Sequence, residues 1–270
     1  MGVLNATPDS FSDGGRFAAR EAALAHALAM IEAGADIIDI GGESTRPGAD
    51  PVPADEEIAR TAPLIEAIRT RTDAVLSIDT MKPVVARAAF AAGATIWNDV
   101  AALREEGALA AAADLGAPVI LMHMQGEPRT MQANPTYADV VAEVIAFLQA
   151  RVRAAEAAGL TQIWVDPGIG FGKTLAHNLA LIDALPRIIA ETGRPLLFGA
   201  SRKSLIAKID PRAGDPMARL GGSLALALAA ADAGADIVRV HDVRETAQAL
   251  AVRAALNAAA ARSDSRPSSA

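Results

Sequence analysis

Eight short apolar runs along the chain each end in a polar, hydrogen-bonding residue, and Ala-rich segments of helical character separate the runs. A strand followed by a helix, repeated through 270 residues, predicts an α/β fold, a single (β/α)8 TIM barrel, which typically needs about 250 residues. Several runs are apolar on both faces, as parallel strands covered by helices must be. The strands are expected near residues 2–6, 36–41, 75–80, 95–100, 118–123, 163–168, 196–201 and 237–242.

The helices are expected to fill the gaps between these strands, for instance over residues 55–71, 136–158 and 216–233. A glycine follows several helical segments within a few residues of the next strand. Glycine at this position ends a helix in the left-handed conformation without steric cost. The glycines with this expected role are Gly34, Gly93, Gly116, Gly159, Gly193 and Gly234.

The barrel is expected to occupy residues 1–262, and the polar segment 263–270 should be a disordered tail. The first strand begins at the first or second residue. We therefore expect either that another segment covers the barrel floor or that part of the natural chain is missing. Segment 223–235 is apolar nearly all round, which indicates either a subunit interface or a helix of small residues lying flat on the barrel.

Composition excludes several classes of function. Cysteine is absent, so disulfides and thiolate chemistry are excluded. The N-terminus does not have the pattern of a signal peptide, and no stretch approaches the roughly 18 apolar residues of a membrane span. The net charge is −7, and neither a basic block nor many aromatic residues are present to bind nucleic acid. A cytoplasmic enzyme is the expected class.

Polar residues at the carboxyl ends of the strands form the active site of a TIM barrel, so these residues are the candidates for chemistry. Two of them are carboxylates, Asp79 and Asp166, and a third is the amide Asn98. A carboxylate can accept two parallel N–H bonds from a flat amidine-like edge, and an amide adds a donor and an acceptor. The three residues suit a heterocycle such as a pterin or guanine. Singly, each could instead pair with a lysine or cap a helix.

The last strand carries Arg239 and His241, which alternate and can therefore face the same side. Two such groups suit a phosphate or pyrophosphate, which barrels most often hold near strands seven and eight. Asn5 on the neighbouring first strand could add an oxygen ligand to Mg²⁺. The alternative for His241 is a structural histidine.

Two motifs resemble known catalytic loops without fitting them. The segment from Asp166 to Thr174 reads Asp-Pro-Gly-Ile-Gly-Phe-Gly-Lys-Thr, but proline stands where a phosphate-binding P-loop needs its first glycine. We interpret it as a tight strand-to-helix loop that exposes Asp166. Ser201 lies in Gly-Ala-Ser-Arg-Lys, which lacks the second glycine of a nucleophile elbow, so hydrolase chemistry is discounted.

Three long loops follow strands on the expected catalytic face, over residues 5–15, 41–50 and 123–135. Their Gly, Ser, Pro and Asp content is typical of lids that order around a ligand. Lys173 and Lys203 also stand out, because lysine is scarce in the chain and each lies in a Gly/Ser-rich loop.

Taken together, the segments from residue 2 to about 256 resemble the dihydropteroate synthase family of the folate pathway. The resemblance rests on several blocks in order: Gly2-Val-Leu-Asn-Ala-Thr-Pro-Asp-Ser-Phe-Ser-Asp-Gly-Gly, Gly41-Gly-Glu-Ser-Thr-Arg-Pro-Gly, Ser77-Ile-Asp-Thr, Asn98-Asp-Val, Met122-His-Met-Gln-Gly, Asp166-Pro-Gly-Ile-Gly-Phe-Gly-Lys, Gly199-Ala-Ser-Arg-Lys-Ser and Arg239-Val-His-Asp-Val. Ala6 stands where the family usually has valine. The family also normally carries a segment before this first strand, often a hairpin that covers the barrel floor.

The resemblance implies a reaction: 6-hydroxymethyl-7,8-dihydropterin pyrophosphate condenses with 4-aminobenzoate to give 7,8-dihydropteroate and pyrophosphate. It also implies dimers and competition by sulfonamides for the aminobenzoate position. The implied roles are as follows: Asp79, Asn98, Asp166 and Lys203 hold the pterin; Met122, Val100, Gly199 and Phe171 line its pocket; Asn5, Arg239 and His241 bind pyrophosphate and Mg²⁺; Thr45, Arg46, Pro47, Phe171, Ser201 and Lys203 surround aminobenzoate; and Asp79, Lys203, Arg239 and His241 carry the catalysis.

Two other functions stay open from the sequence. A barrel methyltransferase that passes a methyl group from a reduced folate to a corrinoid would share Asp79, Asn98 and Asp166, but should lack a site like that of Arg239 and His241. A non-catalytic paralogue would bind pterin without turnover, and the sequence does not favour it.

Overall fold

The structure is a computed structural model that describes residues 1–6, 15–45 and 48–264. Parts of two predicted lids, including Arg46 and Pro47, lie outside the described residues, as does 265–270. The strands are β1 (Gly2–Asn5), β2 (Ile37–Gly41), β3 (Val75–Asp79), β4 (Ile96–Asp99), β5 (Val119–Met122), β6 (Ile163–Asp166), β7 (Leu197–Phe198) and β8 (Ile237–Val238). All eight predicted strands are present among these residues.

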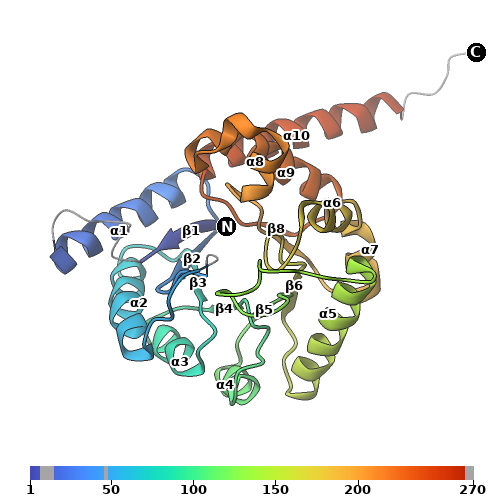
Figure 1. The fold of residues 1–270 in the computed structure, drawn as a ribbon. Helices are drawn as coiled ribbons and strands as arrows, with labels where there is room; N and C mark the ends of the chain where they lie inside the picture. The colour runs from blue at the N-terminus through green and yellow to red at the C-terminus, as the bar shows by residue number, and fades with distance from the viewer. Residues whose placement is uncertain (7–14, 46–47, 265–270) are drawn as a thin grey trace, which may run out of the picture.

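The helices alternate with the strands and surround them (Figure 1). Each of the six glycines predicted to end a helix has a positive φ. The α-helices are α1 (Gly15–Glu32), α2 (Ala54–Arg69), α3 (Pro83–Ala91), α4 (Ala108–Leu115), α5 (Val140–Ala157), α6 (Leu175–Asp183), α7 (Leu185–Thr192), α8 (Ser204–Ile209), α9 (Leu220–Asp232) and α10 (Val243–Asp264), and two 3₁₀ helices, η2 (Pro211–Ala213) and η3 (Pro216–Arg219), lie between α8 and α9.

The strands form a parallel ring in chain order. Strands β1 to β6 pair as one sheet and β7 pairs with β8. Two parallel bridges join these parts, one between Val165 and Leu196 and one between Gly2 and Val240. Hydrogen bonds from Val3 N to Val240 O (3.0 Å) and from Val165 N to Pro195 O (3.0 Å) support the two joints. The predicted TIM barrel is therefore confirmed.

Strands β7 and β8 are shorter than predicted, and a side-chain hydroxyl replaces a backbone carbonyl as a hydrogen-bond acceptor between them. The ladder bond from Arg239 N to Phe198 O (2.9 Å) is still formed. Two residues later, His241 N donates to the hydroxyl of Ser201 (3.1 Å) rather than to a carbonyl. The ends of these two strands are thus held by groups predicted to belong to the site.

Apolar side chains fill the barrel at the amino ends of its strands. Five buried residues come from successive parts of the ring and pack together with Ile37 and Trp164: Met1, Ile96, Ile120, Leu197 and Ile237. The Met1 amino group donates to Val238 O (3.0 Å), which fixes the start of the chain against β8. This layer leaves the carboxyl ends of the strands as the polar side of the barrel.

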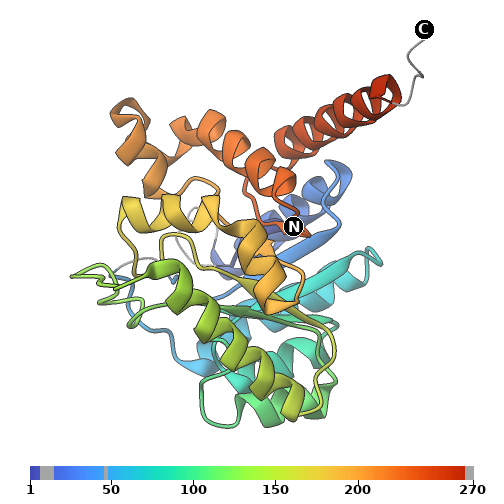
Figure 2. The ribbon, with the colours of Figure 1, turned by 90° about the vertical axis from the view of Figure 1, so that its right-hand side faces the viewer.

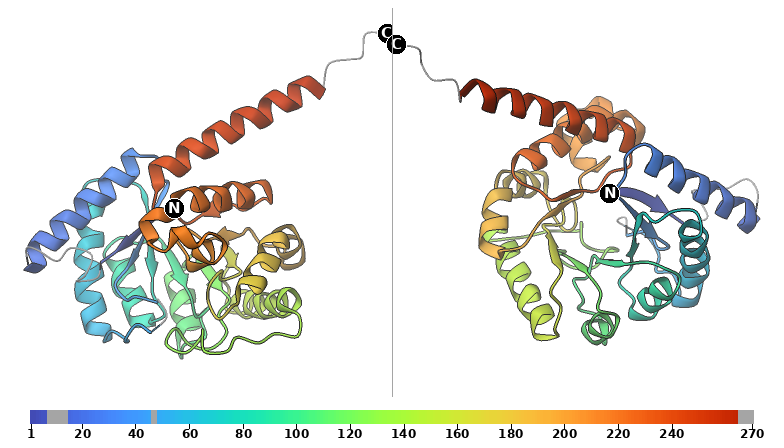
Figure 3. Two further views of the ribbon diagram at one scale, coloured as in Figure 1. Left: turned by 45° about the horizontal axis from the view of Figure 1, so that its top comes forward. Right: turned by 180° about the vertical axis from the view of Figure 1, so that it is seen from behind.

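A larger apolar core lies between the strands and the helices. Small residues on the helices, such as Ala27, Ala86 and Ala112, are fully buried there beside Leu and Ile side chains of the strands. Helix α9 contributes only Ser223, Ala227 and Ala230 as buried residues. Helix α10 runs to Asp264, two residues into the segment predicted to be a disordered tail, and its second half extends away from the barrel (Figures 2 and 3).

Candidate active site

Sheet register places the predicted polar residues on one rim. Asp79 at the end of β3 pairs in register with Gly41 on β2 and with Asn98 on β4. Asp166 ends β6, opposite Met122 on β5. Asn98 and Asp166 are buried, with 4% and 6% of their surface exposed, although both are polar. A buried polar group needs a partner, so each of them must bond within the protein or to a ligand.

Arg239, which directly follows β8, reaches across to the opposite strands and binds two carboxylates. Its Nε donates to Asp39 Oδ2 (2.6 Å) and its Nη2 donates to Asp79 Oδ2 (2.7 Å). The same Asp39 oxygen accepts from Asn98 Nδ2 (3.0 Å). Four strands therefore meet in one hydrogen-bonded group, which we call the rim cluster: Asp39, Asp79, Asn98 and Arg239.

Sequence reasoning missed Asp39, although it is completely buried and central to the rim cluster. It lies in the middle of β2, whereas the polar residues that form the active site of a TIM barrel are expected at the strand ends. The available signal was its charge, because Asp39 interrupts an otherwise apolar run of Ile37-Ile38-Asp39-Ile40. An aspartate at such a position is almost never buried without a partner.

The rim cluster holds more negative than positive charge. Burial raises the pKa of the Asp79 carboxyl to about 7, and the nearby Asp39 adds to this, while Arg239 opposes it. Burial lowers the pKa of the Arg239 guanidinium, but the two carboxylates outweigh it and leave that pKa raised. One oxygen each of Asp39 and Asp79, the Oδ1 atoms, is buried without a hydrogen-bond partner among the described residues. A group that brings a donor or a positive charge would satisfy these oxygens.

A tight loop follows β6, as predicted, but Asp166 is buried there rather than exposed. Gly168 N donates to Asp166 Oδ1 (2.7 Å), which turns the chain at the strand end. Burial raises the pKa of Asp166, while the charge of Lys203 opposes the shift. Lys203 lies just before α8, donates through Nζ to Ile169 O, and places Nζ 4.3 Å from the centre of the Phe171 ring. Burial lowers the pKa of Lys203 to about 8.

Lys173 holds this loop from inside. Its side chain is only 1% exposed, and Nζ lies 2.9 Å from His123 Nδ1 and donates to the carbonyls of Gly168 and Phe171 (both 3.0 Å). Burial lowers the pKa of Lys173 to about 7 and that of His123 to about 3. In this position Lys173 stabilises the backbone of the loop, whereas the lysine of a P-loop reaches phosphates.

The predicted lining residues gather beside the rim cluster. Val100 and Met122 are buried in a small apolar cluster with Met124 and Met131, and Phe171 packs against it. Gly199 lies between the polar groups: a Cβ there would be 3.7 Å from Arg239 Cβ and 3.9 Å from Asp166 Oδ2. The site thus offers an apolar wall next to carboxylates, which is typical of a pocket for a flat polar ring.

The remaining predicted residues lie on the neighbouring loops. His241 Nδ1 is 3.1 Å from Ser201 Oγ, so these two form a pair at the ends of β7 and β8. Asn5 ends β1, which is joined to β8 by the bridge at Val240. Thr45 is half-buried after β2, and Arg46 and Pro47 lie outside the described residues.

The base of the loop after β2 is held by a separate ion cluster. Lys82 Nζ donates to Glu57 (2.6 Å) and to Glu43, and Glu43 Oε1 accepts from Val52 N (3.3 Å). Glu57 is completely buried, and burial raises its pKa, while the hydrogen bond from Lys82 opposes the shift. This cluster fixes where the predicted aminobenzoate loop leaves and rejoins the barrel.

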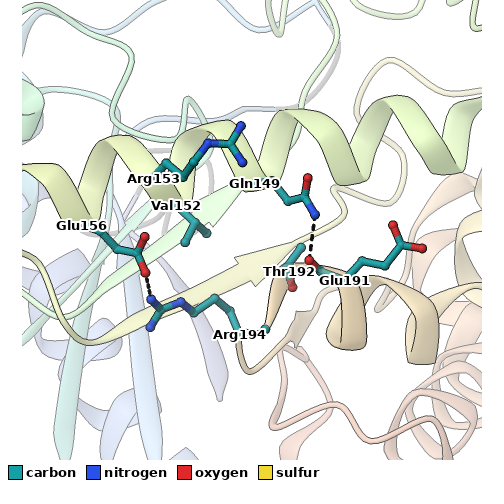
Figure 4. A pocket seen from close by; sticks show the side chains of 8 residues that line it. Gln149, Val152, Arg153, Glu156, Glu191, Thr192 and Arg194 are labelled. Carbon is teal, nitrogen blue, oxygen red and sulfur yellow. Dashed lines mark hydrogen bonds and ion pairs between the residues drawn. The ribbon is translucent and has the colours of Figure 1, made fainter.

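A shallow hollow of about 350 Å³ lies elsewhere, between α5 and α7 (Figure 4). Arg194 pairs there with Glu156, and Gln149 Nε2 donates to Glu191 O (2.8 Å). None of the predicted site residues lines it. Within the described residues, no helix is long and apolar enough to cross a membrane, and no group of three or more acidic, His or Cys side chains could hold a metal ion.

Comparison with known proteins shows the family of the chain. Residues 1–241 match the family described as pterin binding enzyme. Dihydropteroate synthase of Escherichia coli K12 is 51% identical over 254 residues, which cover 93% of this chain and 89% of that protein. A solved structure of Xanthomonas albilineans dihydropteroate synthase with 4-aminobenzoic acid is 52% identical with a TM-score of 0.90, covering 96% of this chain and 92% of that one.

A further structure of the Xanthomonas albilineans enzyme, in complex with 7,8-dihydropteroate, is 50% identical with a TM-score of 0.87 and covers 96% of this chain and 93% of that one. The match thus extends over nearly the whole length of each protein. The chain therefore belongs to the family of pterin-binding enzymes, as a dihydropteroate synthase, a transferase of folate synthesis.

Proposed function

We propose that the chain condenses 6-hydroxymethyl-7,8-dihydropterin pyrophosphate with 4-aminobenzoate, giving 7,8-dihydropteroate and pyrophosphate. The assignment of this reaction to particular residues rests on one observation. Asp79, Asn98 and Asp166 come together at one rim, beside Lys203 and an apolar wall. In this reaction the amine of the second substrate supplies the nucleophile.

The pterin is held by its polar edge. Asp166 keeps one oxygen bonded to Gly168 N and can offer the other to the amino-pyrimidinone edge of the ring. Val100, Met122 and Phe171 pack against the faces of the ring, and Lys203 contributes a positive charge at its rim. Thr45, Arg46, Pro47 and Ser201 surround the aminobenzoate in this proposal, together with Phe171 and Lys203.

The pyrophosphate lies toward β8. Arg239 uses Nε and Nη2 on the carboxylates of Asp39 and Asp79, so its guanidinium still has N–H donors to offer to a phosphate oxygen. His241, next but one along the strand, adds a second group for the same anion. Charge that develops on the departing pyrophosphate is stabilised by these fixed donors, and that stabilisation lowers the barrier.

The methylene carbon of the pterin gains positive charge as its bond to the pyrophosphate oxygen breaks. The carboxylate of Asp79 lies at the rim to stabilise that charge when it is ionised. The amine of aminobenzoate then forms the new C–N bond and loses its proton to the departing pyrophosphate. Because this amine is a weak nucleophile, the protein contributes mainly by positioning it and by excluding water, which would otherwise capture the cation.

Magnesium is the proposed cofactor, and the oxygen ligands near β1 and β8 fit an ion that is bound mainly by the substrate. Mg²⁺ usually keeps several waters and is bound by substrate phosphates with only one or two protein oxygens. Asn5, at the end of β1 and next to β8, is suited to supply one such oxygen. When bound, the ion would neutralise charge on the pyrophosphate.

We also propose that the chain acts as a cytoplasmic homodimer. Exposed apolar side chains support an interface: Leu179 on α6, Ile209 on α8 and Met217 on η3 are 45%, 58% and 65% exposed. Contacts between α6 and α8 and between α8 and η3 bring these elements onto one side of the barrel. Analytical ultracentrifugation at micromolar concentration should give twice the chain mass of 27.7 kDa, and a single species of 27.7 kDa would contradict the dimer.

The reaction is tested by release of pyrophosphate from dihydropterin pyrophosphate with Mg²⁺, with and without 4-aminobenzoate. We expect release that depends on aminobenzoate and stops when Mg²⁺ is chelated. Release at the same rate without aminobenzoate would show hydrolysis rather than synthesis. Binding of dihydropterin with no release under any condition would point to a non-catalytic pterin-binding protein.

A further inference from the structure

Asp39 is a buried charged residue of the rim cluster to which the proposed reaction gives no task. It lies in the middle of β2 with none of its surface exposed. Its Oδ2 accepts hydrogen bonds from two residues that are distant in sequence, Asn98 on β4 and Arg239 directly after β8. A single carboxylate oxygen thus connects a proposed pterin ligand with a proposed pyrophosphate ligand.

Stability alone does not account for this residue. Arg239 already has an ionic partner in Asp79 (2.7 Å), so Asp39 places a second negative charge next to one guanidinium. Asp39 Oδ1 is also buried without a partner among the described residues. A second buried carboxylate with an unsatisfied oxygen costs free energy, and residues that break the rules of packing in this way are expected at functional sites.

The chemistry of Asp39 decides how the amide of Asn98 is turned. The two ends of an asparagine amide have nearly the same size and shape, so packing by itself does not choose between them. A carboxylate can only accept, so the NH₂ group of Asn98 must face Asp39. The carbonyl oxygen of Asn98 is therefore on the side away from Asp39, as a hydrogen-bond acceptor.

We propose that Asp39 is a positioning residue that presents the Asn98 oxygen to an N–H group of the bound ring and holds the Arg239 guanidinium at the rim. The inference rests on the proposed function in taking the ring to be a dihydropterin. A ring with an acceptor at that place would meet the Asn98 oxygen with its own lone pair and be rejected. Asp39 itself does not touch the reacting atoms.

The test compares Asp39→Asn with the wild type in two measurements. Calorimetry gives the affinity for 7,8-dihydropterin without pyrophosphate, and thermal denaturation gives the melting temperature. An amide at position 39 would keep its oxygen on the Arg239 cation, which can only donate, and would turn its NH₂ group to Asn98. The Asn98 amide would then reverse and point its own NH₂ group at the N–H group of the ring, so we expect at least a tenfold loss of affinity. The melting temperature should stay the same or rise, because the variant leaves one carboxylate facing one guanidinium. A residue with a merely structural role would lower the melting temperature and leave the affinity unchanged.

Asp99→Asn is the matched control. Asp99 is equally buried and adjacent to Asn98, but its oxygens accept from the backbone of Ala101 and Leu103 (both 2.7 Å). This variant should lower the melting temperature and leave dihydropterin affinity within twofold of the wild type. An equal loss of affinity in both variants would overturn the specific role of Asp39.

A double variant tests the proposal if Asp39→Asn lowers the melting temperature as well as the affinity. Asp39→Asn combined with Asn98→Asp restores a donor on one side and an acceptor on the other, with an oxygen of residue 98 again turned outward. Affinity should recover at least fivefold relative to Asp39→Asn alone. Two results would overturn the proposal. One is a double variant whose loss of dihydropterin affinity equals the product of the losses of the two single variants; the other is an Asp39→Asn variant that binds dihydropterin within twofold of the wild type.

The assay also separates this proposal from the proposed function. Wild-type chain that binds dihydropterin but releases no pyrophosphate would count against the reaction, and the comparison of Asp39 variants would still be valid. Wild-type chain that does not bind dihydropterin at all would overturn both.

Discussion

Gly168→Ala adds only one methyl group, but it should destabilise the loop after β6 and disturb the site strongly. Gly168 lies in the loop after β6 with φ +68°, and a Cβ there would be 1.9 Å from the carbonyl oxygen of His123. The two must separate by about 1 Å to reach the 3.0 Å below which real Cβ contacts essentially never occur. The neighbouring backbone has little freedom to move, because His123 N donates to Asp166 O (2.9 Å) at the end of the β5–β6 pairing.

The magnitude follows from these contacts. Placing alanine in the left-handed region costs about 1–2 kcal/mol. Moving the loop also weakens the bonds from Gly168 N to Asp166 and from Lys173 to Gly168 O and His123 O, at about 1 kcal/mol each. We expect the free energy of unfolding to fall by about 4–5 kcal/mol. A displacement of about 1 Å that reaches Asp166 should lower the rate of the reaction by about 100-fold, and it should also weaken pterin binding.

Gly193→Ala is the control for the cost of placing alanine in the left-handed backbone conformation. Gly193 ends α7 with φ +62°, nearly the same as Gly168, and a Cβ there would meet no atom within 4 Å. It should lose only about 1–2 kcal/mol and keep the pterin affinity of the wild type. Urea denaturation and calorimetry with 7,8-dihydropterin measure both effects. Equal losses of stability in the two variants, or unchanged pterin affinity in Gly168→Ala, would refute the reasoning.

Three further predictions concern the charged groups. Burial raises the pKa of Asp79 from 3.8 to about 7. The raised pKa therefore contributes to the free energy of unfolding, fully below pH about 4, and this contribution is lost as the pH rises to about 7. Asp79→Asn should therefore lose less stability than the wild type between pH 4 and 8 in urea titrations, and an identical decline would contradict the burial argument. Asp166→Asn replaces an acceptor by a donor and should weaken dihydropterin binding by about 10- to 100-fold in calorimetry, whereas near-normal affinity would remove Asp166 from the site. Arg239→Ala should impair binding of dihydropterin pyrophosphate more than that of plain dihydropterin, and equal losses for the two ligands would count against a pyrophosphate role.

The barrel and most of the rim were predictable from sequence for one physical reason. Parallel strands end on the same side, so the residues that end them must gather there, whatever the details of packing. Asp79, Asn98 and Asp166 are brought together in this way. The ends of the helices were predictable for a similar reason, because a left-handed residue after a helix favours glycine.

Sequence reasoning did not reveal which of these groups bind one another. Contacts between Arg239 and Asp39 or Asp79 depend on the diameter of the closed ring and span up to 200 residues of chain. Asp39 was missed because a mid-strand residue is normally part of the core. Lys173 stands out in the sequence as one of few lysines, but its contacts with His123 and the loop carbonyls depend on how the glycine-rich turn folds, which the spacing of residues does not predict.

A crystal structure of the chain with 7,8-dihydropterin bound would test the central claim most directly. We expect the ring between Asp79, Asn98 and Asp166, with its amino-pyrimidinone edge on the Asp166 carboxylate and the Asn98 oxygen accepting from a ring N–H. Its 6-substituent should be directed toward Arg239 and His241. A ring bound outside this rim, or one that makes no contact with Asp166 and Asn98, would contradict the account.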